Sequence, residues 1–532
     1  LGGDSIKAIQ ISSRLFLAGY KLETHYLFKY PTISELAPWI TLRQASIEQG
    51  AVEGVVPLTP IQTWFLASRQ AEPHHFNQDS FLFRKEGWDP SAVRQVLSKL
   101  TDHHDALRMV YSGINSSTAA DGDVVQFNRG VAGQQNYALE IFDFREAAAE
   151  TEANISSAAA GLQSSFSLEE GPLLKAGIFQ TYDGDYLLIV IHHFVVDGVS
   201  WRILLEDFHL AYQQATQHKE LMLPDKTTSF KVWSESLSRY ANSENLLREL
   251  PYWRGIEEMM VSALPVEGFA REVHYSQDFD SIRITLNEDE TTQMLTRSHR
   301  AYRTEINDLL LASLGLAIRE WTQEDLLVVH LEGHGREPID EQLDLTRTAG
   351  WFTSLYPVIL SVETTELSIV IKTVKETLRR VPNKGTGHGI LKYMSSEATK
   401  ESINFKLQPQ ILFNYLGVFD SQPEKEDGGT PLTGSPLSPL YHDSHLLAFN
   451  SLVTSGQFHM NCRFDTTALN LSTVNSLMER FKYFLLALIT HCSTRQHVEF
   501  TPHDFTENDL SQGQLDDLLE DLEDLTDLED IN

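Results

Sequence analysis

The sequence predicts a mixed α/β protein that is built from more than one globular core. Its 532 residues exceed the usual size of a single domain, and 42% of them are hydrophobic, as in a globular protein. Residues 186–208 begin with a short apolar run typical of a buried strand and continue into a turn and a helix. The same order, a buried strand followed by a polar, glycine-rich exit, returns at residues 326–337. We therefore expect strands and helices to recur in two successive units.

Composition and charge exclude several classes of function. The formal net charge of −32 argues against binding to nucleic acid, whose phosphates need a basic surface, and against an anionic membrane surface. Only two cysteines, Cys462 and Cys492, are present, which indicates a reducing compartment and no disulfide framework. No CxxC or HExxH motif indicates a metal site, and no signal peptide or run of about 18 apolar residues indicates export or a membrane span. We therefore expect a cytoplasmic protein without metal that contacts neither membrane nor nucleic acid.

The central stretch contains the first candidate site. Residues 187–191 are all apolar, and the predicted strand ends on His192 and His193. Neighbouring side chains in an extended chain point to opposite faces, so only one of the two can face a given cavity. A histidine with an ordinary pKa of about 6.5 suits proton transfer, and Asp197 in the following turn could orient it or balance its charge. A pair of core histidines at a strand end is the alternative, and the residues alone leave both open.

A helix is expected after this turn. Its apolar positions repeat at helical spacing, which predicts that Val199, Ile203 and Leu204 face the core. The acidic residues Glu206 and Asp207 are expected on the solvated side of the same helix.

The second candidate site lies at Leu326 to Glu337, with the sequence LLVVHLEGHGRE. Glu332 follows a predicted buried strand, and Gly333 and Gly335 leave room beside it. A lone glutamate at a strand end is usually solvated, but burial would move its pKa towards neutrality and suit it to general acid–base work. Arg336 could form a salt bridge to the other unit or support the site, and the residues do not decide between these roles.

The first 42 residues predict a small helical unit. Asp4 and Ser5 occupy the position of a helix cap, and Gly19 is a plausible stop for that helix. Pro31 is placed to open a second helix. Taken alone, Ser5 is most simply an N-cap. The chain starts within LGGDS and without a methionine, so we expect a fragment of a longer protein.

Several motifs, in the expected order, resemble the condensation superfamily of nonribosomal peptide synthetases. HHFVVDG matches the HHxxxDG signature of that superfamily, and its continuation VSWRILLEDF resembles the epimerization branch. EGHGRE and the FNYLG of ILFNYLGVFD resemble motifs of the same branch, and the condensation branch normally lacks the first glutamate of EGHGRE. Further matching stretches are VVPLTPIQTWFL, PHHFNQ, RTAGWFTSLYPV and NKGTGHGIL. LGGDSIKAIQ and FKYPTISELA resemble the attachment site and the end of a peptidyl carrier protein, so the resemblance covers residues 1–505.

The resemblance implies a fold and a division of the chain. Two lobes that resemble chloramphenicol acetyltransferase are expected to form a V-shaped pseudo-dimer with a tunnel at their interface. A small, partial helical-bundle carrier should precede them. The implied parts are a truncated carrier at 1–42, a linker at 43–55, an N-terminal lobe at 56–225, a C-terminal lobe at 226–505 and an acidic tail at 506–532.

The resemblance also implies roles for individual residues. His193 and Glu332 would be the two catalytic groups, whereas Asp197 would be mainly structural. Asn414 and Tyr415 match cavity-lining positions, although a tyrosine after an asparagine on a strand could as easily be ordinary packing.

By the same resemblance, Ser5 would carry a covalent 4′-phosphopantetheine arm. A phosphodiester at a helix N-terminus meets free backbone N–H groups and the positive end of the helix dipole. The implied reaction is inversion, from L to D, at the Cα of an aminoacyl or peptidyl thioester on that arm, with no metal or pyridoxal cofactor. A condensation domain that forms amide bonds and an inert domain that only docks carriers are the alternatives.

The implied partners are the domains of a synthetase module. They are the chain's own carrier, an upstream adenylation domain, a phosphopantetheinyl transferase and the condensation domain of the next module. Thr506 to Asn532 contains eleven acidic residues and no lysine or arginine, and Leu515, Leu518, Leu522 and Leu525 fall on one helical stripe. This tail is a docking helix for the next module, a linker, or a solvated and mostly disordered end, and the sequence leaves these open.

Three further histidine-containing segments are weaker candidates. His74, His75 and Asn77 could be ligands, but surface or interlobe hydrogen bonding explains them better. His103 to Met109 begins a helix-to-strand passage that we interpret as structural. His388 stands where the family usually has another residue, which makes it a weak site candidate.

Overall fold

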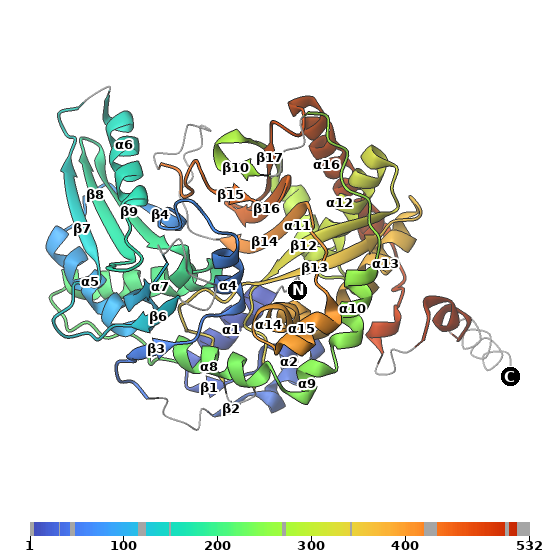
Figure 1. The fold of residues 1–532 in the computed structure, drawn as a ribbon, viewed down its shortest axis with the longest axis horizontal. Coiled ribbons are helices and arrows are strands. Elements are labelled where there is room, and N and C mark those ends of the chain that lie inside the picture. Colours follow the sequence, from blue (N-terminus) through green and yellow to red (C-terminus); the bar gives the residue numbers. More distant parts are fainter. Residues whose placement is uncertain are drawn as a thin grey trace.

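The computed structural model describes residues 5–30, 32–42, 48–114, 124–147, 150–268, 273–340, 343–419, 434–505 and 510–518. Two lobes, each containing its own β-sheet, lie side by side, and several helices pack along one side of their junction (Figure 1). The predicted mixed α/β fold with two lobes is confirmed. The described residues contain no helix that is long and apolar enough to cross a membrane.

A small helical unit forms the N-terminal part of the chain. Its elements are α1 (Ser5–Leu17), β1 (Tyr20–Lys21), α2 (Thr24–Lys29), α3 (Ile33–Leu36), η1 (Ala37–Trp39) and β2 (Thr41–Leu42). α1 begins at Ser5 as predicted, and Gly19 follows its end with a left-handed φ of 86°, a conformation that favours glycine. A capping box between Thr32 and Glu35 starts α3, where the sequence predicts a second helix. α2 was not predicted.

The N-terminal lobe follows. Its elements are β3 (Gly54–Val56), α4 (Pro60–Ala67), β4 (Asn77–Arg84), α5 (Pro90–His103), η2 (Asp105–Arg108), β5 (Met109–Ser112), β6 (Val125–Asn128), β7 (Ala138–Asp143), α6 (Thr151–Ser164), β8 (Leu174–Thr181), β9 (Gly184–His192), η4 (His193–Val195) and α7 (Gly198–Thr216). The main sheet has the order β4-β9-β8-β7, and β3, β6 and β5 form a smaller sheet. β9 therefore lies inside the main sheet, with a partner strand on each side.

β9 is the buried strand that the apolar run predicts. The side chains of residues 187–191 have relative exposures between 0% and 4%, which explains why both faces of the strand are apolar. β9 pairs in antiparallel fashion with β4, and Gln78 lies opposite Ile191. The strand ends at His192, and the 3₁₀ turn η4 places His193 at the edge of the sheet.

The C-terminal lobe contains the larger sheet. Its elements are α8 (Phe230–Tyr240), α9 (Glu244–Leu247), α10 (Leu250–Glu258), β10 (His274–Tyr275), η5 (Ser276–Asp278), β11 (Phe279–Leu286), α11 (Glu288–Thr296), α12 (Ile306–Thr322), β12 (Leu326–Gly333), β13 (Ser354–Ser361), α13 (Leu367–Arg380), η6 (Pro382–Gly385), α14 (Thr386–Tyr393), α15 (Glu397–Ile403), β14 (Ile411–Phe419), β15 (His442–Asp443), β16 (Leu447–Thr454), β17 (Gln457–Asp465), α16 (Leu471–Thr494) and η7 (Pro502–Asp504). The sheet order is β11-β17-β16-β14-β12-β13. β12 runs parallel to β14, with His330 opposite Leu412, so the ends of these two strands lie together.

The helix α7 buries a residue that the sequence places in solvent. Glu206 is exposed as predicted, but the side chain of Asp207 has a relative exposure of only 1%. The carboxylate of Asp207 accepts hydrogen bonds from His104 and Arg347, which come from distant parts of the chain. The prediction for Asp207 is therefore wrong, because a helical pattern reports on the side of the helix and not on distant partners that neutralise a buried charge.

The N-terminal unit packs directly on α7. Ile9 of α1 forms a small buried cluster with Val199 and Ile203 of α7, separate from the main core. Val199 and Ile203 are buried as predicted, but against α1 instead of the interior of the lobe. α1 is thereby fixed beside the turn that follows His193.

A segment of the C-terminal lobe crosses to the N-terminal lobe. Residues 434–442 run beside the start of β4, where the backbone N–H of Asn77 donates to the carbonyl of Pro436 at 2.9 Å. The N–H of Ser438 donates in turn to the carbonyl of His75 at 2.9 Å. This crossing segment joins the two lobes by main-chain hydrogen bonds.

The described part of the acidic tail is residues 510–518. Leu515 is buried, and the side-chain amide of Gln512 donates to the carbonyl of Phe500 at 3.1 Å. The remainder of the tail, including two leucines of the predicted stripe, lies outside the described residues, as do residues 43–47 of the predicted linker. The stripe itself stays a prediction.

Candidate active site

A cavity of about 240 Å³ lies between the two lobes. His193 and Asp197 border it from the N-terminal lobe, and Glu332 and Asn414 border it from the C-terminal lobe. The fold thus brings the two predicted proton-transfer groups, His193 and Glu332, to the wall of one cavity.

His193 is held at the cavity by aromatic rings and by one amide. Its ring is half-buried, lies parallel to the ring of Phe76 at 4.9 Å and contacts Trp351 at 4.6 Å. The Nε2 of His193 is 2.8 Å from the Nε2 of Gln78. Burial lowers the pKa of His193, because a charged imidazolium is poorly solvated among these rings. The side chain is therefore neutral near pH 7.

Glu332 lies at the end of β12, across the cavity. The carboxylate is half-buried, and burial together with the negative charge of Asp443 raises the pKa of Glu332 to about 7. The side-chain amide of Asn414 donates a hydrogen bond of 2.5 Å to Oε2 of Glu332. Near neutral pH this group can therefore both donate and accept a proton.

A chain of polar groups explains the charge on Asp443. Its carboxylate accepts hydrogen bonds from His445 at 3.2 Å and from Arg463 at 2.8 Å. Burial opposes ionisation of Asp443, but His445 and Arg463 outweigh it and lower the pKa of Asp443 to about 2. His330, two residues before Glu332 on β12, joins this chain through Nδ1, which lies 2.9 Å from Nε2 of His445. None of these polar partners was predicted from the sequence.

His192 points away from the cavity, as strand alternation predicts. Its side chain is fully buried, and its Nε2 lies 2.9 Å from the carbonyl oxygen of Pro73. Its Nδ1 accepts a hydrogen bond from the backbone N–H of Phe194 at 3.2 Å. Burial lowers the pKa of His192 to about 3, so the ring stays neutral and ties the segment before β4 to η4.

Asp197 and Arg336 join the two lobes beside the cavity. Asp197 caps α7 by accepting a hydrogen bond from the backbone N–H of Ser200 at 2.7 Å. Arg336 contacts both carboxylate oxygens of Asp197, at 3.2 and 3.4 Å, and its guanidinium lies 3.9 Å from the centre of the Phe352 ring. Of the two roles left open for Arg336, the interlobe salt bridge is the one observed.

Asn414 and Tyr415 both border the cavity but differ in their surroundings. Asn414 contacts Glu332 directly. Tyr415 is only 8% exposed and belongs to the hydrophobic core. Because neighbouring side chains alternate along β14, Tyr415 points away from the face that presents Asn414.

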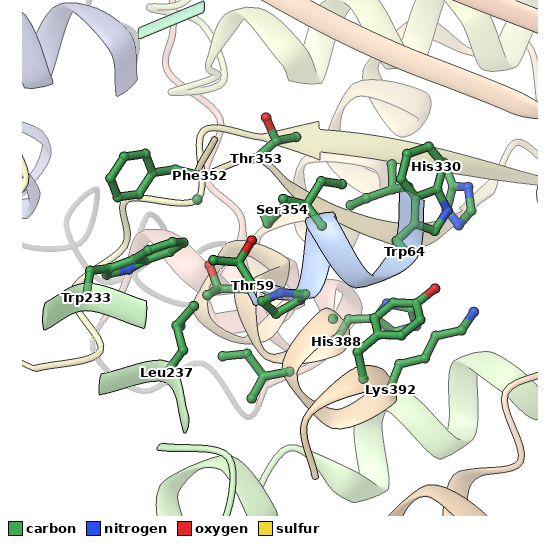
Figure 2. A pocket seen from close by; sticks show the side chains of 18 residues that line it. Thr59, Trp64, Trp233, Leu237, His330, Phe352, Thr353, Ser354, His388 and Lys392 are labelled. Atoms are coloured by element: carbon green, nitrogen blue, oxygen red, sulfur yellow. The ribbon is translucent and has the colours of Figure 1, made fainter. Parts of the chain in front are cut away.

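A second, smaller cavity of about 50 Å³ adjoins the first (Figure 2). The two share Gly335, Thr353 and Ser354 in their walls. His388 lies in this second cavity, with Nε2 at 3.5 Å from a carboxylate oxygen of Glu257. His388 is therefore not brought together with the candidate catalytic pair.

The other histidine candidates have structural partners. Nε2 of His75 lies 2.8 Å from the carbonyl oxygen of Ser435, which is the expected interlobe contact, and the buried amide of Asn77 donates to the carbonyl of Gln163 at 2.8 Å. We assign no ligand role to His74.

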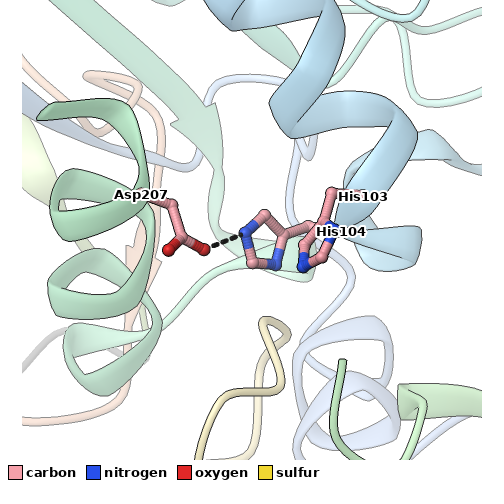
Figure 3. Close-up of side chains that lie close together, drawn as sticks. All are labelled: His103, His104 and Asp207. Atoms are coloured by element: carbon pink, nitrogen blue, oxygen red, sulfur yellow. Dashed lines mark hydrogen bonds and ion pairs between the residues drawn. The ribbon is translucent and has the colours of Figure 1, made fainter. Parts of the chain in front are cut away.

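His103, His104 and Asp207 lie close enough together to hold a metal ion (Figure 3). His104 is already 2.9 Å from Asp207, however, and Arg347 donates to the other oxygen of the same carboxylate at 2.5 Å. A cation would have to displace this guanidinium, so we interpret the cluster as a structural ion pair. α5 ends at His103 and β5 begins at Met109, which confirms the predicted helix-to-strand passage.

Sequence reasoning missed three residues that surround His193. Gln78, Trp201 and Trp351 all lie in motifs that were recognised, PHHFNQ, VSWRILLEDF and RTAGWFTSLYPV. The signal in the sequence that could have indicated these residues was their place within recognised motifs. Strand pairing, which places β4 beside β9, was needed to show that Gln78 meets His193, and the rest of the fold was needed to bring Trp201 to Gln78 and Trp351 to His193.

Comparison with known proteins matches both the sequence and the fold. Residues 52–511 match the family model for the Condensation domain. Relatives include Surfactin synthase subunit 1 of Bacillus subtilis (strain 168), 44% identical over 531 residues, and Tyrocidine synthase 1 of Brevibacillus parabrevis, 41% identical over 535 residues. Each match covers 98% of this chain, but the chain spans only 14% and 48% of the length of these two relatives.

Two solved structures illustrate the range of similarity. The epimerization domain from the third module of tyrocidine synthetase B is 41% identical and gives a TM-score of 0.79, over 84% of this chain and 100% of that one. The condensation domain of the Monacolin K polyketide synthase is 14% identical with a TM-score of 0.62, over 84% and 99% of the two chains, which indicates a shared fold. Because the family model matches most of its length, the chain belongs to the condensation-domain family.

Proposed function

We propose that the chain is a carrier–epimerization unit of a nonribosomal peptide synthetase, an isomerase that inverts the Cα of an aminoacyl or peptidyl thioester. The observation that carries this proposal is the pairing of His193 with Glu332 in one interlobe cavity. The histidine is neutral, and the pKa of the glutamate is raised to about 7. Both groups can therefore exchange protons near neutral pH.

The chemistry of a thioester fits this pair. Its α-proton is removable because the resulting carbanion delocalises into an enolate. Inversion needs removal of the proton on one face of Cα and return of a proton on the other. His193 and Glu332 come from different lobes, so they can serve opposite faces of a substrate held between them. Asn414 uses one N–H on Glu332, and its second N–H is available to a developing enolate oxygen.

The substrate would be tethered to a 4′-phosphopantetheine arm on Ser5. Support comes from α1, which begins at Ser5 and whose Ile9 packs against Val199. Val199 also borders the cavity, so this helix lies at its rim. When bound, the arm supplies the thioester whose α-proton is acidic. Ser5 would hold the arm, and Gly198 borders the cavity where an added Cβ would lie 3.4 Å from Leu416.

Two other functions fit the same observations less well. A condensation domain would use the histidine loop but does not need Glu332. The similarity to an epimerization domain at 41% identity, against 14% for a condensation domain, also favours inversion. An inert carrier-docking domain would have no use for a glutamate whose proton is exchangeable near neutral pH. The proposed partners remain an adenylation domain before the carrier, a phosphopantetheinyl transferase, and the condensation domain of the next module.

The test begins by loading the chain. A phosphopantetheinyl transferase and L-phenylalanyl-coenzyme A should attach the aminoacyl arm, which intact mass detects. Release of the amino acid and chiral chromatography should then show D-phenylalanine without any added acceptor. Ser5→Ala should gain no mass. Accumulation of an amide only when an amine acceptor is supplied, with chirality retained, would identify a condensation domain instead.

Variants of the pair test the mechanism. His193→Ala and Glu332→Gln should each slow inversion by about 100-fold or more, as expected for loss of a general acid or base, with folding nearly intact. His192→Ala is the matched control and should reduce stability more than chemistry, because its ring is buried away from the cavity. Parental inversion rates in both His193→Ala and Glu332→Gln would refute the proposed pair.

A further inference from the structure

A short chain of hydrogen bonds leads from Trp201 through Gln78 to His193. The indole N–H of Trp201 donates to Oε1 of Gln78 at 2.9 Å. An indole nitrogen can only donate, so the group of Gln78 that it meets must be the carbonyl oxygen. Trp201 therefore fixes which way round the amide of Gln78 lies, independently of how its two ends are assigned.

The fixed amide decides the protonation state of His193. With Oε1 turned to Trp201, the NH₂ group of Gln78 is the end that lies 2.8 Å from Nε2 of His193. An amide NH₂ cannot accept a hydrogen bond, so Nε2 must be unprotonated and accept one. The ring proton then belongs on Nδ1, which is buried, and the ring also interacts with backbone groups of His193 and Val196. Contacts with Phe76 and Trp351 hold the ring in this orientation.

The charged and titratable surroundings do not oppose this state. On the segment of His193 itself, Asp197 is paired with Arg336, which comes from the loop after β12. The cavity beside the ring is also lined by other charged and titratable groups, which are Glu305, Asp308, Glu332, His334, Glu337, Tyr356, Arg379, Lys384 and Tyr415. His192 ends β9, and His74 and His75 lie on the segment before β4. None of these groups contacts Nε2 in place of Gln78.

We propose that Gln78, held by Trp201, is a positioning residue that keeps Nε2 of His193 unprotonated until the substrate enters the cavity. This proposal rests on the proposed function and assigns its starting roles: in the L-to-D direction His193 begins as the base and Glu332 as the acid. As the substrate enters, the N–H of Gln78 leaves the lone pair of Nε2. The Cα–H bond then breaks and its proton forms the N–H bond on Nε2, while the electron pair passes to the enolate. The O–H bond of Glu332 then breaks as a new Cα–H bond forms on the other face. The imidazolium and the carboxylate return to their starting states by proton exchange with water.

The first test is the pH profile of inversion, measured on the loaded chain. In Gln78→Glu a carboxylate would accept a hydrogen bond from a protonated Nε2, which favours the imidazolium and raises the pKa of His193. The acidic limb of the rate profile should therefore move up by about one pH unit or more, and the rate should recover in alkaline buffer. Trp201→Phe frees the amide of Gln78 to turn its oxygen towards Nε2. The acidic limb of the rate profile should therefore also move to higher pH, but by a smaller amount.

A matched control separates positioning from general damage. Gln70 is half-buried and joins the crossing segment through the carbonyl of His442 at 2.8 Å, but it does not border the cavity. Gln70→Glu introduces the same charge and should leave the limb in place. A purely structural role for Gln78 would instead lower the rate of Gln78→Glu by the same factor at every pH, and that result would overturn the proposal.

The second test needs no turnover, so it stands even if the chain does not epimerize. In ¹⁵N-histidine-labelled protein, the signals that disappear in His193→Gln identify His193. The parent should show the tautomer protonated at Nδ1, and Trp201→Phe should show a mixture of tautomers. A parental signal from the tautomer protonated at Nε2, or from an imidazolium at pH 7, would overturn the positioning role. Absence of inversion with the expected tautomer would count against the proposed function alone.

Discussion

Glu332 contributes to stability with an unusual dependence on pH. Its pKa lies near 7 in the folded chain against an ordinary value of 4.5, so between these values the folded state binds more protons than the unfolded state. The free energy of unfolding must then fall as pH rises through this window. We predict that parental protein loses up to roughly 3 kcal/mol more than Glu332→Gln between pH 4.5 and 7.5, since one pKa unit corresponds to about 1.4 kcal/mol.

Urea unfolding at both pH values measures this difference. Asp79, whose pKa is also raised by burial to about 6, contributes with the same sign in both proteins and cancels in the comparison. Glu320→Gln, at a surface ion pair with Arg480, is the control and should follow the parent. Parallel pH curves for the parent and Glu332→Gln would show that Glu332 is not protonated near neutrality.

The sequence could indicate Glu332 but not the cause of its altered pKa. A glutamate after an apolar strand already suggests burial. Asp443 lies more than a hundred positions after Glu332, and so does the histidine that connects Asp443 to His330. No local sequence pattern marks these two residues. Gln78 escaped for the same reason, because its partners Trp201 and His193 meet it only through strand pairing.

At the scale of elements, the sequence predicts strands better than it predicts helix faces. The apolar runs at 187–191 and 326–329 mark β9 and β12, and each of these strands lies between two others in its sheet. α7 is harder, since one of its sides packs against α1 and another carries the buried Asp207. Periodicity identifies the helix, but it cannot tell which neighbour covers each side.

The ion pair between Arg347 and Asp207 should contribute strongly to holding α7 against the segment before β13. Arg347 precedes β13, whereas Asp207 lies on α7, and both side chains are at most 3% exposed. Arg347→Met would leave the carboxylate with His104 alone, so we predict a loss of about 3 kcal/mol in the free energy of unfolding. The double variant with Asp207→Asn should recover part of that loss, because the buried negative charge is then absent.

Denaturant unfolding of the parent, both single variants and the double variant gives the coupling energy. Arg347→Lys keeps the positive charge but loses the planar guanidinium with its several N–H donors. Its free energy of unfolding should lie between those of the parent and Arg347→Met. Equal stability of Arg347→Met and the parent would mean that the pair is energetically neutral in its buried setting.

At the scale of the whole molecule, the candidate site belongs to neither lobe alone. His193 and Glu332 face each other only after the lobes have come together. The length allows three or four cores and the returning strand pattern predicts a second unit, but neither gives an angle between units. The resemblance to a known family supplied that arrangement and the division of the chain, whereas the cytoplasmic location came from composition. The division and the location stay predictions.

The acidic tail is predicted to contact a partner and not the cavity. Because Leu515 is buried and Gln512 bonds Phe500, the informative deletion removes only residues 519–532, which contain seven of the eleven acidic residues. Inversion on the attached carrier should be unchanged. Association with the condensation domain of the next module should weaken, most clearly at low salt, where charges attract over the longest distance. Slower inversion with unchanged association would contradict a docking role.

The crossing segment at 434–442 has a consequence for how the chain is made on the ribosome. β4 is an edge strand of its sheet, and the start of that edge meets its main-chain partners, near Leu437, only when most of the polypeptide has been synthesised. Until then the N-terminal lobe exposes unpaired backbone groups, which is the condition under which strands of different molecules associate. Nascent chains that stall before residue 434 should therefore depend on chaperones and aggregate when these are scarce, whereas completed chains close their own edge.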